Sequence, residues 1–243
     1  MSDQTRTALV TGGVQGIGAA AARALADVGV KVAVTHLGAG DRAEAFAQET
    51  GMPVFEWDVS DYDACVDGVT KVEEAIGPLD ILVNNAGCNK DVMFHKMDRE
   101  DWDIVMRVDL GSMFNVTRQV IGGMRARGFG RIINISSVNA ANGQAGQTNY
   151  CAAKAGVEGF TRALARESAS KGITVNVVAP GYADTAMVDA VPDEIVEKIL
   201  EMVPLSRLAE PEEIGRCVRF LAADEAAYIT GAILDVNGGL RMG

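Results

Sequence analysis

The chain has 243 residues, of which 48% are hydrophobic and 23% charged, and its formal net charge is −11. This length suits one well-filled core, so we expect a single domain over residues 1–243. The acidic balance disfavours nucleic acid and anionic membrane as partners.

Short β-branched runs alternate with longer helical runs along the chain. The strand-like runs are residues 7–12, 31–37, 53–59, 79–85, 131–137, 173–180 and 232–238. Helical runs between them include residues 18–29, 63–77, 101–128 and 211–225. Apolar strands that alternate with helices predict an α/β fold with a doubly wound parallel sheet covered on both faces. Such sheets bind ligands at the carboxyl ends of their strands.

The first predicted strand runs into a glycine-rich turn, TGGVQGIG, at residues 11–18. Glycine leaves the backbone bare there, so its amides and the positive end of the next helix could receive a pyrophosphate. Such turns also serve purely steric purposes, but the strand before and the alanine-rich helix after favour dinucleotide binding. The candidate contacts are Gly12, Val14, Gln15, Gly16, Ile17 and Gly18.

The segment after the second predicted strand bears on the choice of cofactor. An acid there usually binds the ribose 2′-hydroxyl of NAD, whereas basic side chains accept the 2′-phosphate of NADP. Residues 35–37 contain no acid, and His36 and Arg42 are the candidate contacts. Both could instead be solvated loop residues, and Gln15 stands where a basic residue would strengthen the case. The pattern favours NADP(H) and leaves NAD(H) open.

Two further strand ends carry candidate nucleotide contacts. Asp58 and Val59 end the third predicted strand, where a carboxylate and an apolar side chain could bracket an adenine. Asn85, Ala86 and Gly87 follow the fourth and would lie beside the nucleotide. The alternative is that both segments are ordinary capped turns, because Asp and Asn are common there.

Tyr150 and Lys154 lie four residues apart in the segment GQTNYCAAKAG, residues 146–156. In a helix this spacing is a rise of about 6 Å, so the two side chains overlie one another. A charged lysine would lower the pKa of the tyrosine, which could then give a proton to a carbonyl oxygen. Ser137, at the end of the fifth predicted strand, could hold the same oxygen. Tyr-x-x-x-Lys alone is a frequent surface pair, so the combination with the glycine turn carries the prediction.

Taken together and in this order, the motifs resemble the short-chain dehydrogenase/reductase family over nearly the whole chain, from Thr7 onward. The resemblance implies a Rossmann-like sheet of seven parallel strands in a homotetramer. It implies that Tyr150 is the general acid/base, that Lys154 lowers its pKa and contacts the nicotinamide ribose, and that Ser137 orients the substrate carbonyl. It also implies that a segment embraces the nicotinamide amide through Pro180, Gly181 and Thr185.

Within the family, KDVMFHKM, GQAGQTNY and VNGGLRMG are similar to segments of the reductases of acetoacetyl-CoA in polyhydroxybutyrate synthesis. That similarity implies NADPH-dependent reduction of acetoacetyl-CoA, a small-molecule acyl thioester, to (R)-3-hydroxybutyryl-CoA. The substrate contacts that it implies are Asp91, Ser137, Gln144, Gln147 and Tyr182.

Two alternatives stay open. One is 3-oxoacyl-(acyl-carrier-protein) reductase, whose sequences are similar around ITVNVVAPG. Those enzymes have a basic residue just before GRI, whereas this chain has Gly128 and Phe129, which favours a CoA thioester. The other is a dinucleotide-binding sensor without catalysis, which would be expected to have lost Tyr150 or Lys154.

One position departs from the family pattern. The family generally has asparagine in the segment VDLGSMF, at the place of Asp109, and there the backbone carbonyl holds a water that links the lysine to solvent. Asp109 has the same carbonyl, and we place it among the catalytic residues. Its side chain differs, because asparagine can donate a hydrogen bond and ionised aspartate only accepts. Since the carbonyl is unchanged, we expect Asp109→Asn to alter turnover little.

Residue types also bear on metals and on location. The four cysteines form no paired motif, so reduced thiols in a cytoplasmic protein are the default. Two histidines without a Cys/His cluster predict no metal site. No uncharged apolar run approaches the roughly 20 residues that span a bilayer, and the N-terminus has no signal pattern. We therefore expect a cytoplasmic protein.

Overall fold

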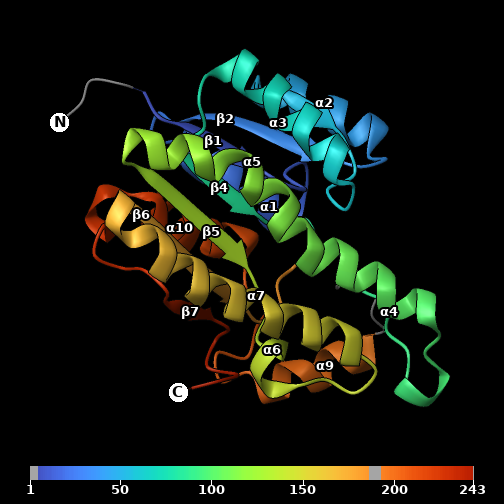
Figure 1. The fold of residues 1–243 in the computed structure, drawn as a ribbon. Coiled ribbons are helices and arrows are strands. Elements are labelled where there is room, and N and C mark those ends of the chain that lie inside the picture. The colour runs from blue at the N-terminus through green and yellow to red at the C-terminus, as the bar shows by residue number, and fades with distance from the viewer. Residues whose placement is uncertain (1–4, 186–192, 243) are drawn as a thin grey trace.

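The computed structural model describes residues 5–185 and 193–242. Seven parallel strands form one sheet in the order β3-β2-β1-β4-β5-β6-β7 (Figure 1). The strands are β1 (Thr7–Val10), β2 (Lys31–His36), β3 (Val54–Glu56), β4 (Ile81–Asn84), β5 (Gly130–Ile135), β6 (Ile173–Pro180) and β7 (Ile233–Val236). The predicted doubly wound parallel sheet is therefore confirmed.

The strand order reverses between β1 and β4. From β1 the chain builds outward through β2 to β3, and it then returns to the other side of β1 with β4. Val10 accordingly pairs with Val34 on one side and with Val83 on the other. A crevice opens outside the carboxyl ends of the strands at such a reversal, and ligands bind there.

Helices cover both faces of the sheet. One face packs against α1 (Gly16–Ala26), α2 (Gly40–Thr50) and α10 (Pro211–Ala222), the other against α3 (Tyr62–Ile76), α5 (Ser112–Arg127) and α7 (Thr148–Ser168). Within β1, Ala8 and Val10 belong to the core with α1 and α10, whereas Leu9 belongs to the core with α3 and α5. Because both faces are covered, consecutive strand residues are apolar instead of alternating.

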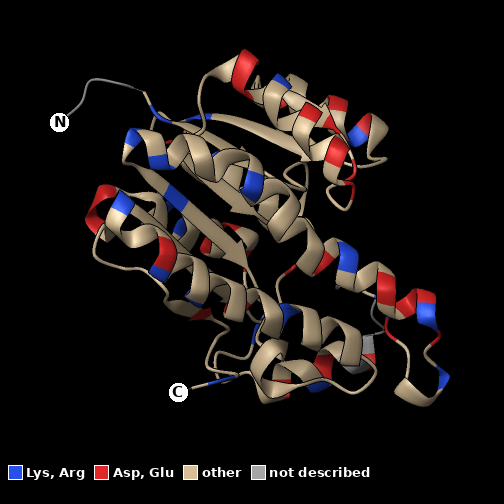
Figure 2. Cartoon of the chain, viewed as in Figure 1, with Lys and Arg blue, Asp and Glu red and all other residues tan. Residues whose placement is uncertain are grey.

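Shorter elements complete the described chain. They are α4 (Arg99–Val105), α6 (Asn139–Asn142), α9 (Asp193–Met202) and the 3₁₀ turns η1 (Phe94–Lys96), η3 (Ala169–Lys171) and η4 (Asp224–Ala226). Figure 2 shows acidic and basic residues interspersed along the outer helices, such as α2, α3 and α4. None of the helices in residues 5–185 and 193–242 combines the length and the apolar character that crossing a membrane requires.

The run predicted as helical over residues 101–128 is helical without a break through Arg127, but its winding changes within it. After α4 the chain forms a π-helical segment, η2 (Met106–Gly111), and only then α5. A π segment hydrogen-bonds to the fifth residue back and so carries one extra residue per turn. The wider turn belongs to the segment in which Asp109 is completely buried.

Candidate active site

Tyr150 and Lys154 overlie one another on α7, as their spacing predicts. The Lys154 ammonium lies 5.4 Å from the centre of the Tyr150 ring. Lys154 is buried, and its Nζ donates a hydrogen bond to the Ile135 carbonyl at 3.1 Å. Buried Asn149 anchors this end of α7, because its Nδ2 donates to the carbonyls of Lys90 and Asp101. The pair is thus tied to the end of β5 and to the loop after β4.

Asp109 completes this group from the π-helical segment. Its Oδ2 lies 3.0 Å from Lys154 Nζ, and its Oδ1 accepts from the backbone N–H of Cys88 at 2.8 Å. Oδ2 has no aligned hydrogen bond, so the contact with Lys154 is an ion pair in character. Because both contacts bring a donor or a cation to the carboxylate, aspartate fits this buried position.

The pKa of Tyr150 is raised, whereas the sequence predicted that Lys154 would lower it. Burial is the largest cause and disfavours phenolate. Lys154 lowers the pKa as expected and a hydrogen bond with Ser137 adds to that effect, but the Asp109 carboxylate opposes both. The prediction was wrong in net direction, because it included neither the burial nor the negative charge.

Lys154 keeps its charge in this buried place. Burial alone would lower its pKa, yet the attraction of Asp109, with smaller help from Tyr150, leaves the pKa raised. A buried ammonium without such a partner would tend to lose its proton. Asp109 is therefore the largest single influence that favours the charged form of Lys154.

The glycine turn between β1 and α1 is held against the loop after β4. The hydroxyl of Thr11 accepts from the backbone N–H groups of Asn85 and Ala86, and Asn85 Nδ2 donates to the Thr11 and Gly12 carbonyls. An added Cβ at Gly12 would lie 3.1 Å from the Ala86 backbone. These predicted cofactor segments are thus brought together at the strand reversal.

The start of α1 fits a pyrophosphate. Gln15, at the N-cap, is exposed and makes no side-chain cap hydrogen bond, so the first amides of the helix have no side-chain acceptor there. An added Cβ at Gly16 would lie 3.3 Å from Thr185, which places the end of the 180–185 segment against the turn. Val14 is buried in the core and Ile17 packs against it, so Val14 offers the site only its backbone.

Two of the other predicted nucleotide contacts have local partners. Asp58 Oδ1 accepts from the N–H of Ser60, which is the ordinary turn cap considered as the alternative. Val59 is buried, and its carbonyl accepts from Asn115. Gly181 donates to the Val236 carbonyl, which ties the 180–185 segment to the end of β7.

The side chain of an acidic residue from β3 reaches the loop after β2, and sequence reasoning missed it. His36 Nδ1 accepts from the N–H of Ala39, while Glu56 Oε1 accepts from the N–H of Gly38. Glu56 comes from β3, where it pairs in register with His36. Arg42 is exposed at the first turn of α2. Only the parallel pairing of β2 with β3 could have revealed this carboxylate.

Some of the predicted substrate contacts form one hydrogen-bonded group. Gln147 Nε2 donates to Asp91 at 2.9 Å, and Gln147 Oε1 accepts from Asn139 at 3.0 Å. The backbone of Gly146 accepts from Val92, and Gln144 accepts from the N–H of Gln147 in a turn. The loop after β4 is therefore linked to the segment just before α7.

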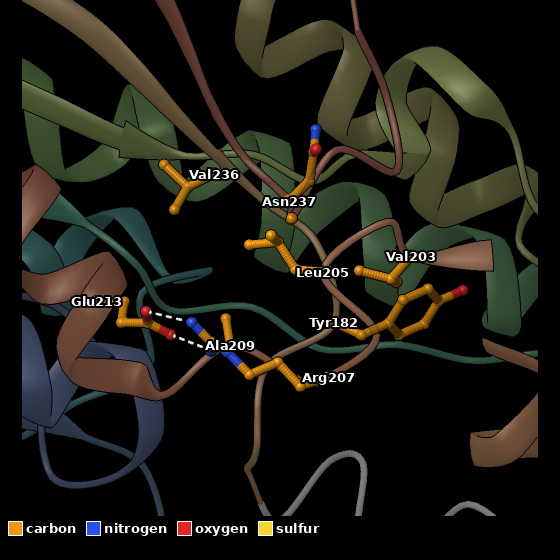
Figure 3. A pocket seen from close by; sticks show the side chains of 9 residues that line it. Tyr182, Val203, Leu205, Arg207, Ala209, Glu213, Val236 and Asn237 are labelled. Carbon is orange, nitrogen blue, oxygen red and sulfur yellow. Dashed lines mark hydrogen bonds and ion pairs between the residues drawn. The ribbon is translucent and has the colours of Figure 1, made fainter. Parts of the chain in front are cut away.

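Tyr182 lies in a different set of contacts. It lines a cavity of about 90 Å³ with residues from the segment before α10, the first turn of α10 and the end of β7. Figure 3 shows the paired side chains of Arg207 and Glu213 at this cavity, with Tyr182 on the side away from Glu213. The volume is far below the roughly 300–1,000 Å³ of ordinary ligand pockets, so this cavity does not hold an acyl thioester.

Among residues 5–185 and 193–242 there is no cluster of three or more His, Cys, Asp or Glu side chains that could hold a metal ion. The cysteines at positions 65, 88, 151 and 217 are free thiols.

Comparison with known proteins agrees with this geometry. Residues 12–241 match the family model described as enoyl-(acyl carrier protein) reductase. The chain is 56% identical to an acetoacetyl-CoA reductase of Rhizobium meliloti over 97% of this chain and 98% of that protein. It is 55% identical to an acetoacetyl-CoA reductase of Shinella zoogloeoides, with the same coverage. It is 43% identical to a 3-oxoacyl-(acyl-carrier-protein) reductase of Staphylococcus aureus over 98% of this chain and 99% of that protein.

Proposed function

Because this chain belongs to the short-chain dehydrogenase/reductase family, and is therefore a nicotinamide-dependent oxidoreductase, we propose that it reduces acetoacetyl-CoA to (R)-3-hydroxybutyryl-CoA with NADPH. The observation that carries the proposal is the Tyr150–Lys154–Asp109 group, in a chain 56% identical to an acetoacetyl-CoA reductase. The product is the hydroxyacyl unit of polyhydroxybutyrate, so the proposed place is in the synthesis of that polymer.

In the proposed reaction Tyr150 is the general acid. Ser137 and Tyr150 hold the ketone oxygen of the substrate, and the phenol gives its proton to that oxygen as the carbon is reduced. A bound reduced nicotinamide supplies the hydride. The raised pKa of Tyr150 keeps the phenol protonated at neutral pH, which is the form that reduction requires. General acid catalysis of this kind contributes roughly 10²–10⁴-fold to the rate.

Lys154 has two proposed roles. Its charge limits the rise in the pKa of Tyr150, and its ammonium contacts the ribose of the nicotinamide. The proposed cofactor cradle is the glycine turn with Asn85, Ala86 and Gly87 on one side and Thr185 on the other. Asp91 and Gln147 would contact the thioester, because they lie in one hydrogen-bonded group before Tyr150.

The proposed preference for NADPH rests on His36 and Arg42. No acid directly follows β2, and Arg42 is exposed where a 2′-phosphate could reach it. Glu56 works against this preference, because its carboxylate would repel a phosphate in the same loop. NADH therefore stays as the alternative cofactor.

The second candidate is reduction of a 3-oxoacyl group on a carrier protein. A carrier-protein reductase is 43% identical to this chain, lower than the acetoacetyl-CoA reductases. Phe129 stands where those enzymes have a basic residue, and the guanidinium groups of Arg6 and Arg131 lie 4.1 and 4.4 Å from the centre of its ring. Asp224 pairs with Arg6, so part of this positive charge is already compensated. The balance favours the CoA thioester.

One set of initial rates tests the proposal. Acetoacetyl-CoA and an acetoacetyl carrier protein would each be offered with NADPH and with NADH. We expect the highest kcat/KM with acetoacetyl-CoA and NADPH. Turnover of the carrier-bound substrate alone would establish the second candidate. Tight cofactor binding without any turnover would instead establish a sensor. The homotetramer and the cytoplasmic location also stay predictions.

A further inference from the structure

The ion pair between Asp109 and Lys154 is almost completely withdrawn from solvent. Asp109 is 0% exposed and Lys154 is 3% exposed, and their charged atoms lie 3.0 Å apart. Charges act strongly in such a place, because the effective dielectric constant is far below that of water. The charge of the Asp109 side chain therefore acts on Tyr150, which lies on the same helix as Lys154.

Several contacts fix the carboxylate in this position. Its Oδ1 is held by the N–H of Cys88, and its backbone belongs to the π-helical segment. Gly87 leaves the necessary space, because an added Cβ there would lie 2.9 Å from Asp109 Oδ2 and 3.4 Å from Lys154 Nζ. The position of the Asp109 carboxylate is thus fixed by the Cys88 hydrogen bond and by the space that Gly87 leaves.

The titratable groups around Tyr150 come from three elements of the described chain. Lys154 and Cys151 come from α7, Asp109 from η2, and Cys88 from the loop after β4. Burial raises the pKa of the Cys88 thiol to about 11, so this thiol is neutral at neutral pH. The net charge that Tyr150 experiences is accordingly set by Lys154 and Asp109.

We propose that Asp109 is a positioning residue whose carboxylate offsets the charge of Lys154 and so keeps Tyr150 in its acid form. It thereby extends carbonyl reduction to higher pH than a neutral side chain at this position would allow. The inference rests on the proposed role of Tyr150 as general acid. It replaces the sequence-based view that only the backbone carbonyl of Asp109 matters.

The direction of the effect follows from the charges. A carboxylate near Tyr150 disfavours phenolate. Removing it makes the phenol lose its proton at lower pH as long as Lys154, which keeps its hydrogen bond to the Ile135 carbonyl, stays protonated. Reduction needs the phenol and would fall off at lower pH in the neutral variant. Oxidation of the hydroxyacyl product needs the phenolate and would begin at lower pH. The midpoints of the pH–rate profiles for reduction and for oxidation therefore both move to lower pH. Each midpoint reflects the coupled ionisation of Tyr150, Lys154 and Asp109.

The test compares the unmodified enzyme with Asp109→Asn in both reaction directions across pH. We expect both pH–rate midpoints to move down by about 1 pH unit. Asp103→Asn is the matched control, because Asp103 is paired with Arg99 on the surface of α4. It removes the same charge from a neighbouring element and should leave both midpoints unchanged.

A second readout is independent of the substrate. The ionisation of Tyr150 would be followed by NMR of ¹³Cζ-labelled tyrosine without ligands, assigned with Tyr150→Phe. A lower midpoint in Asp109→Asn, and in Asp109→Ser, supports the inference even if acetoacetyl-CoA is not the substrate. Slower turnover or lower stability without a shift in either readout would make Asp109 merely structural and overturn it, and so would an upward shift.

Discussion

The chemistry proposed for Tyr150 depends on how a few residues hold it. Asn149 pins the start of α7 to the loop after β4, and Ile135 and Asp109 hold Lys154 one turn further on. Tyr150 itself is only partly buried, so its phenol can face a ligand. The place of the tyrosine is thus fixed through its neighbours on α7.

Removing the phenol oxygen should abolish most of the activity. We expect Tyr150→Phe to lower kcat by about 10²–10⁴-fold, because the general acid is lost. Cofactor affinity, measured by fluorescence titration, should change little. Tyr228→Phe is the control, since Tyr228 is fully exposed and should keep full turnover. Retention of most of the activity in Tyr150→Phe would refute the proposed mechanism.

At the scale of elements, the glycine turn and α1 form a close-packed corner with the loop after β4. An added Cβ at Gly18 would lie 2.3 Å from the Gly12 carbonyl oxygen, which is backbone and cannot move aside cheaply. Glycine is required at position 18 because the start of α1 packs directly against the backbone of Gly12. That requirement is steric, and the same bare backbone is what a pyrophosphate needs.

Gly18→Ala should therefore destabilise the protein by about 1–3 kcal/mol, as overpacking does. Urea unfolding would measure the change. Gly159→Ala, at an exposed position on α7, is the matched control, because an added Cβ there meets nothing within 4 Å. That variant should be stabilised by about 0.4–1 kcal/mol, because alanine loses less entropy in a helix. If both variants are equally stable, the backbone at this corner can accommodate an added methyl group and the expected steric conflict is refuted.

The loop between β2 and α2 should decide between the two cofactors. We expect Arg42→Ala to raise the KM for NADPH several-fold and to leave the KM for NADH nearly unchanged, because only NADPH carries the 2′-phosphate. Glu56→Gln, which removes the nearby negative charge, should lower the KM for NADPH. Steady-state kinetics with each cofactor would measure both. If the unmodified enzyme prefers NADH, the interpretation of this loop is wrong.

At the scale of the whole molecule, exposed aromatic residues lie on both sides of the sheet. Tyr62 on α3 and Phe114 on α5 stack with their ring centres 6.0 Å apart, and both are exposed. Phe220 is exposed on α10, which covers the opposite face, and Tyr228 follows it before the edge strand β7 (Figure 1). A tetramer built from pairs of two-fold axes needs at least two different contact surfaces per chain.

We therefore expect a solution mass four times the 25.6 kDa of one chain. Phe114→Glu should halve this mass, and Phe220→Glu should do the same by disrupting the other surface. Light scattering coupled to size exclusion would measure each mass. Val28→Glu is the control, because Val28 is an exposed apolar residue at the end of α1. An unmodified protein of one or two chains would contradict the expected homotetramer.

The strands of the sheet, the glycine turn and the overlying pair of Tyr150 and Lys154 could all be predicted from the amino-acid sequence. Each of these features depends on residues that are close in the sequence. Short apolar runs alternating with longer helical runs predict buried strands and helices, and residues four apart lie on one face of a helix. The family resemblance added the expected roles, and the matches to known reductases confirmed the family. Local patterns were therefore sufficient wherever the neighbours in space are also neighbours in the chain.

The groups that surround Tyr150 and Lys154 could not be predicted, because they come together through folding. Asp109 reaches Lys154 because a π-helical segment lies within the predicted helix, and Glu56 reaches Gly38 because β3 pairs with β2. Neither approach follows from spacing, because each depends on how distant segments pack. The same is true of the pKa of Tyr150: burial and an opposing carboxylate outweigh the lysine, and both are properties of the folded interior.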